Sequence, residues 1–236
     1  DQLVVVRLQA DADLLLLSHL CSLLKVRPAP VGDGTGTIVA TLAGRFAETD
    51  AALFVDIGST TTDIVELWKG KPVPTGLTDI ERLKSGELVY TGARRTPVCA
   101  LLGPQVAAEL FATTQDAYVL LDMIPEDPDD THTADGKPAT RHWAHIRLAR
   151  MLGGDGETVD NDSTLDLANA VRDRQLEIIA QGAAKVTRRM PEQPGAVVLS
   201  GSGSFLGTHL FTQPGIKTIS LTDRLGLALS EAPCAF

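Results

Sequence analysis

The sequence is poor in aromatic residues and cysteines, and it contains no long apolar run. Aromatic residues make up 4% of the 236 residues. The apolar run Leu14–Leu17 is interrupted by His19, far short of the ~20 residues that a membrane-spanning helix needs. No basic stretch followed by an apolar one opens the chain, so no secretory signal is visible. We therefore expect a cytoplasmic protein without a membrane partner.

The cysteine pattern also argues against a zinc site. Cys21, Cys99 and Cys234 are widely spaced, and none of them belongs to a C-x-x-C pair. Structural zinc sites usually draw their thiolates from such closely spaced pairs. Free thiols in a reducing compartment are the simpler interpretation.

Basic residues are too few and too scattered for a nucleic-acid-binding protein. Lys and Arg number 21 against 30 Asp and Glu, which gives a formal net charge of −9. Proteins that bind the phosphate backbone need a cluster of Lys and Arg, so we expect small-molecule partners and no nucleic acid. The content of 44% apolar and 22% charged residues is typical of a chain that folds around a sizeable core. A homo-oligomer is compatible with this composition, which does not fix the oligomeric state.

Strand patterns alternate with helix patterns along the chain, which predicts an α/β fold. The expected strands are Leu3–Leu8, Ala51–Val55, Thr60–Leu67, Leu88–Tyr90, Ala196–Leu199 and Lys217–Leu221. The expected helices are Ala12–Val26, Thr37–Phe46, Pro104–Phe111, Gln115–Met123, Ala139–Leu152, Thr164–Arg189 with Ser163 as its N-cap, and Phe205–Phe211. The acidic stretch Pro125–Lys137 is expected to be a loop. The first residue is not Met and Glu231–Phe236 looks like the start of a helix, so we expect a piece of a longer polypeptide.

The clearest chemical motif is FVDIGSTTTD, which begins at Phe54. A buried strand carries Asp56 into a tight turn, where Gly58 lets a phosphate approach the backbone without meeting a Cβ. Asp56 and Asp63 are the carboxylates expected to hold Mg²⁺, in part through water. The turn also offers N–H and hydroxyl groups that can surround an anion, from Ser59, Thr60, Thr61 and Thr62. The alternative is a plain β-hairpin in which threonine serves β-propensity; three consecutive threonines favour the functional interpretation.

A second motif, VVLSGSGSF, begins at Val197. An apolar strand opens into small residues and then into a helix pattern, an arrangement that lets a ligand lie against a strand-to-helix turn. Gly201, Ser202 and Gly203 are the expected binding residues. The motif does not follow the dinucleotide pattern G-x-G-x-x-G, because the third glycine is missing. An ordinary loop between a strand and a helix is the alternative.

DIGSTTTD and the distant LSGSGSFL together resemble the second phosphate loop and the adenosine-side loop of the actin, sugar-kinase and heat-shock-chaperone superfamily. Those proteins consist of two ribonuclease-H-like domains, with mixed sheets flanked by helices, that close on a nucleotide. The resemblance implies a main ribonuclease-H-like domain at 51–236 with a helical insert at about 104–190. Residues 1–50 would be a remnant of the N-terminal half. The first phosphate loop of that superfamily, another DxG motif, does not occur before Asp56.

A longer series of motifs is similar to one family within the hydantoinase/oxoprolinase-like branch of this superfamily. The family is linked to tetrahydromethanopterin-dependent one-carbon transfer, and its archaeal members act in methanofuran biosynthesis. The similarity is dense at 51–155 and 196–236 and weak at 1–46. The matching motifs are FVDIGSTTTDIVEL, GLTDIERLKSGELVYTGARRTPVCAL, ELFATTQDAYVLL, TADG, RLARMLGGD and VVLSGSGSFL.

The resemblance implies a transferase reaction. Archaeal members of the family join an aminomethyl-furan diphosphate to the phenol oxygen of γ-glutamyltyramine, with release of diphosphate. The resemblance also implies a catalytic role for Arg94 and Arg95 in GARRTP, because arginine binds phosphate in a bidentate manner. Asp135 in TADG gains a role toward substrate or metal in the same way. From spacing alone, a solvated arginine pair and a turn-forming aspartate are the alternatives, and Glu87 is a further carboxylate candidate with an ordinary surface residue as its alternative.

Two other functions remain open from the sequence. An ATP-dependent kinase or hydantoinase/oxoprolinase-like enzyme of the same superfamily needs the same loops, with ATP as the polyphosphate ligand. A non-catalytic nucleotide-binding protein would keep the loops for structure alone, although the presence of Asp56, Gly58 and Asp63 favours an enzyme. We therefore expect Mg²⁺ as the cofactor, together with ATP or a diphosphate-bearing substrate.

Overall fold

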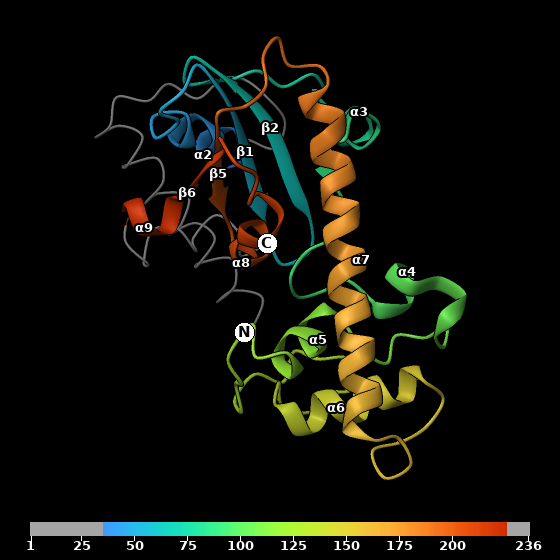
Figure 1. The fold of residues 1–236 in the computed structure, drawn as a ribbon. Helices are drawn as coiled ribbons and strands as arrows, with labels where there is room; N and C mark the ends of the chain where they lie inside the picture. The colour runs from blue at the N-terminus through green and yellow to red at the C-terminus, as the bar shows by residue number, and fades with distance from the viewer. Residues whose placement is uncertain (1–34, 226–236) are drawn as a thin grey trace, which may run out of the picture. The chain divides into compact units, whose positions relative to one another are not determined.

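The computed structural model describes residues 35–225. The elements expected at Leu3–Leu8, Ala12–Val26 and Glu231–Phe236 lie outside the described residues. Within them, six strands form one sheet in the order β3-β2-β1-β5-β6, with β4 also paired to β2. Figure 1 labels β1, β2, β5 and β6 of this sheet. The strands are β1 (Ala51–Ile57), β2 (Thr62–Trp68), β3 (Lys71–Pro72), β4 (Leu88–Val89), β5 (Ala196–Ser200) and β6 (Lys217–Ser220).

The sheet is mixed, and only one strand of its main path runs against the others. β2 is antiparallel to both β1 and β3, whereas β1 and β5 are parallel and so are β5 and β6. This strand order, with the second strand reversed, is the topology of a ribonuclease-H-like sheet. The expected α/β class with a mixed sheet flanked by helices is confirmed.

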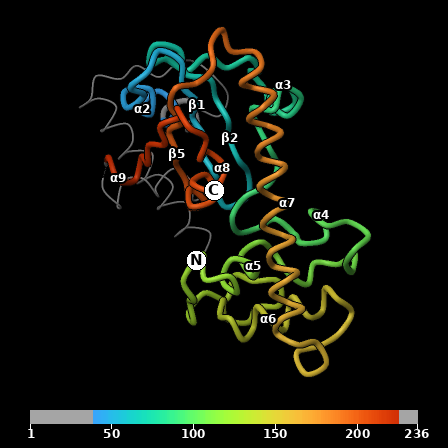
Figure 2. Tube along the Cα trace, viewed as in Figure 1, coloured from blue at the N-terminus to red at the C-terminus, as the bar shows by residue number. Residues whose placement is uncertain are grey.

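The chain forms two compact units. Among the described residues, the sheet unit comprises 35–89 and 180–225, and the insert unit comprises Tyr90–Ile179. The helix α7 (Asn161–Thr187), drawn in orange in Figure 2, carries the chain from the insert unit back into the sheet unit. α2 (Thr35–Ala43) packs in the same core as the sheet. The predicted limits, with a remnant at 1–50 and a main domain at 51–236 that carries a helical insert at about 104–190, stay predictions.

Each face of the sheet is covered by helix. On one face, Val39, Ala40 and Ala43 of α2 share a core with alternate residues of the central strands, which are Ala52, Phe54, Val65, Leu67, Ala196 and Val198. On the other face, Gly182 of α7 lies so close to the sheet that a Cβ there would be 3.0 Å from Cδ1 of Ile64. All seven residues of β1 are buried, as the continuous apolar run predicts. The other helices of this unit are α3 (Asp79–Ser85), α8 (Ser204–Leu210) and α9 (Leu221–Leu225).

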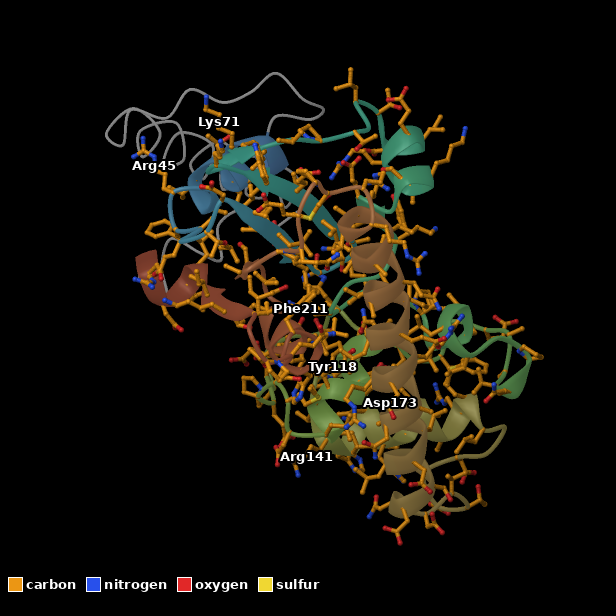
Figure 3. All side chains as sticks on the ribbon, turned by 45° about the horizontal axis from the view of Figure 1, so that its top comes forward. Arg45, Lys71, Tyr118, Arg141, Asp173 and Phe211 are labelled. Atoms are coloured by element: carbon orange, nitrogen blue, oxygen red, sulfur yellow. The ribbon has the colours of Figure 1, made fainter. Side chains whose placement is uncertain are left out.

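The insert unit is helical and has its own apolar core. Its helices are α4 (Val98–Leu102), the single 3₁₀ turn Gly103–Gln105, α5 (Thr114–Leu120), α6 (Arg141–Met151) and the first part of α7. The core residues are Val98, Leu101, Leu102, Ala112, Ala117, Leu148, Met151, Leu167, Ala168 and Val171. Tyr118, labelled in Figure 3, donates a hydrogen bond to Oε1 of Gln175 on α7. Gln175 in turn donates to the carbonyl of Gly92 at 2.8 Å, so the beginning of the insert is bonded to its last helix.

Two predictions about helices were wrong. Pro104–Phe111 does not form a helix beyond Gln105, because the backbone bonds elsewhere: Ala107 N–H donates to the carbonyl of Met151 at 2.9 Å. Ser163 is not the N-cap of the long helix, since α7 already begins at Asn161. The carboxylate of Asp160 accepts a hydrogen bond from the N–H of Ser163. The other expected elements within the described residues are present with shifted ends.

A buried arginine ties the insert unit together. Arg147 on α6 is fully buried. Its Nε donates to Oδ1 of Asp116 at 2.7 Å, and its Nη1 donates to Oδ1 of Asp135 at 2.9 Å. Burying these charges costs solvation, which the multiple hydrogen bonds must offset. Removing the arginine alone would therefore leave a buried carboxylate without its counter-charge.

We expect Arg147→Met to lower the free energy of unfolding by about 3–5 kcal/mol, because Asp116 would lose its counter-charge inside the core. Urea denaturation followed by circular dichroism measures this loss. Arg150→Met is the control, since Arg150 is exposed on the same helix and should change stability by less than about 0.5 kcal/mol. Adding Asp116→Asn to Arg147→Met should recover part of the loss. Equal urea midpoints for Arg147→Met and the unaltered protein would contradict the structural role of this network.

Candidate functional site

The two phosphate-loop-like motifs meet at the carboxyl ends of β1 and β5. The two strands are parallel neighbours, and Asp56 is in register with Ser200. The loops that follow the strands are bonded to each other, since Gly203 N–H donates to the carbonyl of Ile57 at 2.8 Å. The fold therefore places side by side two segments that are about 145 residues apart in the sequence, as ligand binding by both loops would require.

The two aspartates of the first motif stand opposite each other on β1 and β2. Asp56 and Asp63 are in register across the antiparallel pair, so their side chains project from the same face of the sheet. Asp56 is 7% exposed, and the side chain of Asp63 is 23% exposed. Asp56 continues the row of Ala52 and Phe54, so the site lies at the end of the face on which α2 packs.

Asp63 is not a free carboxylate. Its Oδ1 accepts a hydrogen bond from Nη2 of Arg82, and the two groups form an ion pair. Arg82 lies on α3, whose start is fixed by a capping box between Thr78 and Glu81 and whose end is Gly86 in the left-handed conformation. An arginine has five N–H donors, so Arg82 can bind Asp63 and still offer donors to an anion.

Sequence reasoning missed Arg82. The residue lies in the segment GLTDIERLKSGEL, and no local pattern separates it from Lys84 or from the other surface-type charges of an amphipathic turn. Its side chain is only 13% exposed, unlike a typical solvated arginine. The sequence signal that could have found Arg82 is the family motif GLTDIERLKSGELVYTGARRTPVCAL, which contains Arg82 as well as Arg94 and Arg95.

A close backbone contact holds Asp56 in place. Gly201 has a φ of +90°, and a Cβ at this position would lie 2.4 Å from Oδ1 of Asp56 and 2.3 Å from the carbonyl oxygen of Ile57. No side chain fits into such a distance, so glycine is required both by the conformation and by the space. The Asp56 carboxylate therefore rests directly on the backbone of the second loop.

The loop residues differ in what they can offer to a ligand. Ser59, Thr60 and Thr61 are partly exposed and Ser202 is exposed. The N–H of Gly58 donates to the carbonyl of Thr61 at 2.9 Å, and the N–H of Gly203 donates to the carbonyl of Ile57. These two N–H groups therefore stabilise the loops, and they are not available to bind an anion. Thr62 is fully buried in β2. The ligand-binding role of Thr62 stays a prediction.

The arginines and the aspartate predicted from the later motifs belong to the insert unit. Arg94 forms an ion pair with Asp130, and its Nε donates a hydrogen bond to Oε1 of Gln115 at 3.3 Å. Arg95 is exposed. Asp135 accepts hydrogen bonds from the N–H of Lys137 at 3.1 Å and from Arg147, so it holds the turn of its loop. Catalytic roles for Arg94, Arg95 and Asp135 stay predictions.

Glu87 is a structural residue of the sheet unit rather than an ordinary surface residue. It is 1% exposed. Its carboxylate accepts hydrogen bonds from the N–H groups of Thr75 at 2.6 Å and Gly76 at 2.7 Å, and from the hydroxyl of Ser85 at 2.8 Å. These bonds hold the segment before α3 and thereby the helix that carries Arg82.

The oxygen donors of the site suit Mg²⁺ better than a soft metal. Within residues 35–225, no group of three or more His, Cys, Asp or Glu side chains could hold a metal ion. The site instead offers the carboxylate of Asp56 and the neighbouring hydroxyls, and Mg²⁺ accepts a few protein oxygens while it keeps several waters.

None of the described helices is long and apolar enough to cross a membrane.

The order and directions of the strands define a ribonuclease-H-like α/β protein whose candidate site lies where the two loops meet. The chain belongs to the hydantoinase/oxoprolinase family, whose sequence pattern matches residues 31–231. This match covers both loops and the whole insert unit.

Two curated archaeal relatives are similar to most of this chain. Both are named (4-{4-[2-(gamma-L-glutamylamino)ethyl]phenoxymethyl}furan-2-yl)methanamine synthase. The protein from Methanocaldococcus jannaschii is 32% identical over 195 residues, which is 79% of this chain and 58% of that protein. The protein from Methanococcus vannielii is 31% identical over 196 residues, which is 78% of this chain and 87% of that protein. The chain thus spans little more than half the length of the first relative.

Among solved structures, the chain is similar to the activator of the 2-hydroxyisocaproyl-CoA dehydratase from Clostridium difficile with bound ADPNP. The TM-score is 0.35 at 10% identity, over 83% of this chain and 62% of that chain. A likeness at this level carries no argument about function.

We expect Gly201→Ala to displace Asp56 and to destabilise the sheet unit. Gly215→Ala is the matched control, because Gly215 has a φ of +91° but nothing within 4 Å of the added Cβ. Backbone strain alone should cost Gly215→Ala about 1–3 kcal/mol, and the overlap at position 201 should cost about 1–3 kcal/mol more. Urea denaturation of the two variants measures the difference. Equal losses would show that Asp56 does not rest on Gly201.

The free energy of unfolding should fall at low pH as the carboxylate of Asp135 becomes protonated. Burial raises the pKa of Asp135, but the N–H of Lys137 and the Arg147 guanidinium outweigh it and hold this pKa below its usual range. The ionised carboxylate therefore stabilises the fold above the unfolded pKa of about 3.9, and this contribution is lost as the pH falls through the lower folded value. Asp135→Asn should be less stable at pH 7, and its difference from the unaltered protein should shrink below about pH 4.

Urea denaturation of both proteins between pH 7 and pH 3 measures this dependence. Asp166→Asn is the control, because Asp166 is exposed on α7 and should change stability little at any pH. A constant difference between Asp135→Asn and the unaltered protein over the whole range would exclude a stabilising role for the ionised carboxylate.

Proposed function

We propose that this protein is a diphosphate-releasing transferase of one-carbon cofactor biosynthesis. It would join an aminomethyl-furan diphosphate to the phenol oxygen of an acceptor such as γ-glutamyltyramine. The names of the two archaeal relatives support this proposal, because the compound in those names contains a phenoxymethyl-furan ether. The observation that carries it is the meeting of the two loops at β1 and β5, with Asp56 facing Asp63 across the strands.

The reaction needs a site that stabilises a leaving diphosphate. The bond between the furfuryl carbon and the diphosphate oxygen breaks, the phenol oxygen forms the new bond to that carbon, and the phenol proton passes to a base. Negative charge grows on the diphosphate as it leaves, so fixed donors and cations accelerate the step. Partly exposed Ser59, Thr60 and Thr61 supply hydroxyl donors at the turn, and Arg82 supplies a nearby cation that is already held by Asp63.

Mg²⁺ would be held on the Asp56 side of the site and would neutralise charge on the diphosphate when bound. Asp56 suits this task because it is nearly buried and is fixed against Gly201. A carboxylate that is already oriented does not need to be ordered when the ligands arrive, and this pre-organisation is a main source of catalytic power. Asp63 would act by orienting Arg82 rather than as a free metal ligand.

An ATP-dependent enzyme of the same superfamily is the second candidate. The hydantoinase/oxoprolinase family match over residues 31–231 favours it, since the same loops would equally bind the phosphates of ATP. Under this alternative, Asp56 and the loop hydroxyls would hold the triphosphate, and ADP rather than diphosphate would be the product.

A phosphorus NMR time course with Mg²⁺ separates the two candidates. One sample contains the protein with furfuryl diphosphate and γ-glutamyltyramine, and the other contains the protein with ATP. Diphosphate release that requires the phenolic partner supports the transferase. Formation of ADP in the second sample, with no reaction in the first, would overturn it in favour of the ATP-dependent enzyme.

We expect Asp56→Asn to lower turnover by about 10²–10³-fold, because the loss of one charge removes the anchor for Mg²⁺. The thermal midpoint should stay within about 2 °C of that of the unaltered protein, since asparagine has nearly the same size. Initial rates of diphosphate release and differential scanning calorimetry measure the two effects. Asp166→Asn, with its exposed position on α7, is the control and should change neither. A large loss of stability in Asp56→Asn with little change in rate would indicate a structural role instead.

A further inference from the structure

One buried hydroxyl group in the sheet unit makes no hydrogen bond with the rest of the described residues. Ser200, the last residue of β5, is fully buried. Among the side-chain nitrogen and oxygen atoms buried within residues 35–225, its Oγ is the one without a hydrogen-bond partner. A buried hydroxyl without a partner is unfavourable for stability. Native proteins contain few buried polar groups without a partner, and contact with a bound ligand, ion or water is one explanation for such a group.

The position of Ser200 points to the site of the two loops. Ser200 is in register with Asp56 on β1, and Asp56 is in register with Asp63 on β2. Residues in register on neighbouring strands share a face of the sheet, so the three side chains form one row across β2, β1 and β5. Register with β6 ends one residue earlier, at Leu199 and Ser220. The row therefore ends at Ser200, at the carboxyl edge of the sheet.

The surroundings of Ser200 limit what its hydroxyl can bind. The next residue, Gly201, brings its backbone against Oδ1 of Asp56, so the hydroxyl and the carboxylate lie on adjoining parts of one crowded corner. The Oγ is closed to phosphate and to water alike in this structure, and a water molecule, being much smaller than a phosphate group, needs the smaller displacement of the surrounding atoms to reach it. Mg²⁺ in proteins keeps several waters, which are held by carboxylates and hydroxyls around it.

We propose that Ser200 is a metal-site residue whose Oγ accepts a hydrogen bond from a water bound to Mg²⁺, beside the Asp56 carboxylate. This inference rests on the proposed function, because it assumes that the site holds Mg²⁺ with a diphosphate. It assigns to Ser200 a role different from that of the loop residues Ser59, Thr60 and Thr61, which under the proposed function would bind the diphosphate directly. It also explains why β5 ends with a serine and not with another apolar residue.

The test is the binding of Mn²⁺, used as a paramagnetic substitute for Mg²⁺, to the full chain in the presence of inorganic diphosphate. Electron paramagnetic resonance of free Mn²⁺ gives the affinity. We expect Ser200→Ala to weaken this affinity about tenfold, as for the loss of one hydrogen bond to a charged group. Its thermal midpoint without metal should be unchanged or higher, because the variant removes a hydroxyl that has no partner in the fold.

Ser220→Ala is the matched control. Ser220 lies on the neighbouring strand β6 in register with Leu199, and its hydroxyl accepts a hydrogen bond from the N–H of Asp223. This variant should lose a little stability and keep its Mn²⁺ affinity. Equal Mn²⁺ affinity in Ser200→Ala and the unaltered protein overturns the inference, and so does a clear fall in the thermal midpoint of metal-free Ser200→Ala. Failure of the unaltered protein to bind Mn²⁺ with diphosphate overturns the proposed function as well.

Discussion

The site of this protein depends on the contact between the Asp56 carboxylate and the backbone of Gly201. The parallel pairing of β1 and β5 brings the two strand ends together, and Gly201, with a φ of +90°, lies against the carboxylate of Asp56 and the carbonyl of Ile57. Because no Cβ fits there, one residue without a side chain fixes the position of a charged one. The hydrogen bond from Gly203 to Ile57 then joins the loops, and the remaining features of the site are arranged around this corner.

Charge at the site is balanced within the sheet unit. Asp56 and Asp63 stand opposite each other, and two carboxylates at that separation repel unless a cation lies close by. Arg82 provides the cation for Asp63, and the Glu87 carboxylate supports the segment that leads into the helix of Arg82. Asp56 lies beside this ion pair, nearly buried and in contact with the backbone of Gly201.

The insert unit shows that a chemically rich motif can serve the fold. Asp135 belongs to TADG, and its carboxylate bonds Lys137 and the buried Arg147. Arg147 also pairs with Asp116, so three charged residues from separate segments close the acidic loop over α5 and α6. Such a network holds irregular backbone in one conformation, since each buried charge requires the others. A role of Asp135 toward substrate would have to be compatible with this structural task.

The sequence by itself determined the alternation of strands and helices, the hairpin around Gly58 and the two loop motifs. These features depend on apolar periodicity and on glycine, whose effects are local. Only the tertiary structure decided that Arg82 pairs with Asp63, that Thr62 is buried, and that residues 104–111 exchange helical bonds for a bond to Met151. The unpartnered hydroxyl of Ser200 also appears only when β5 lies beside β1. Each of these outcomes depends on partners far away in the sequence, and local patterns carry no information about which distant groups will meet.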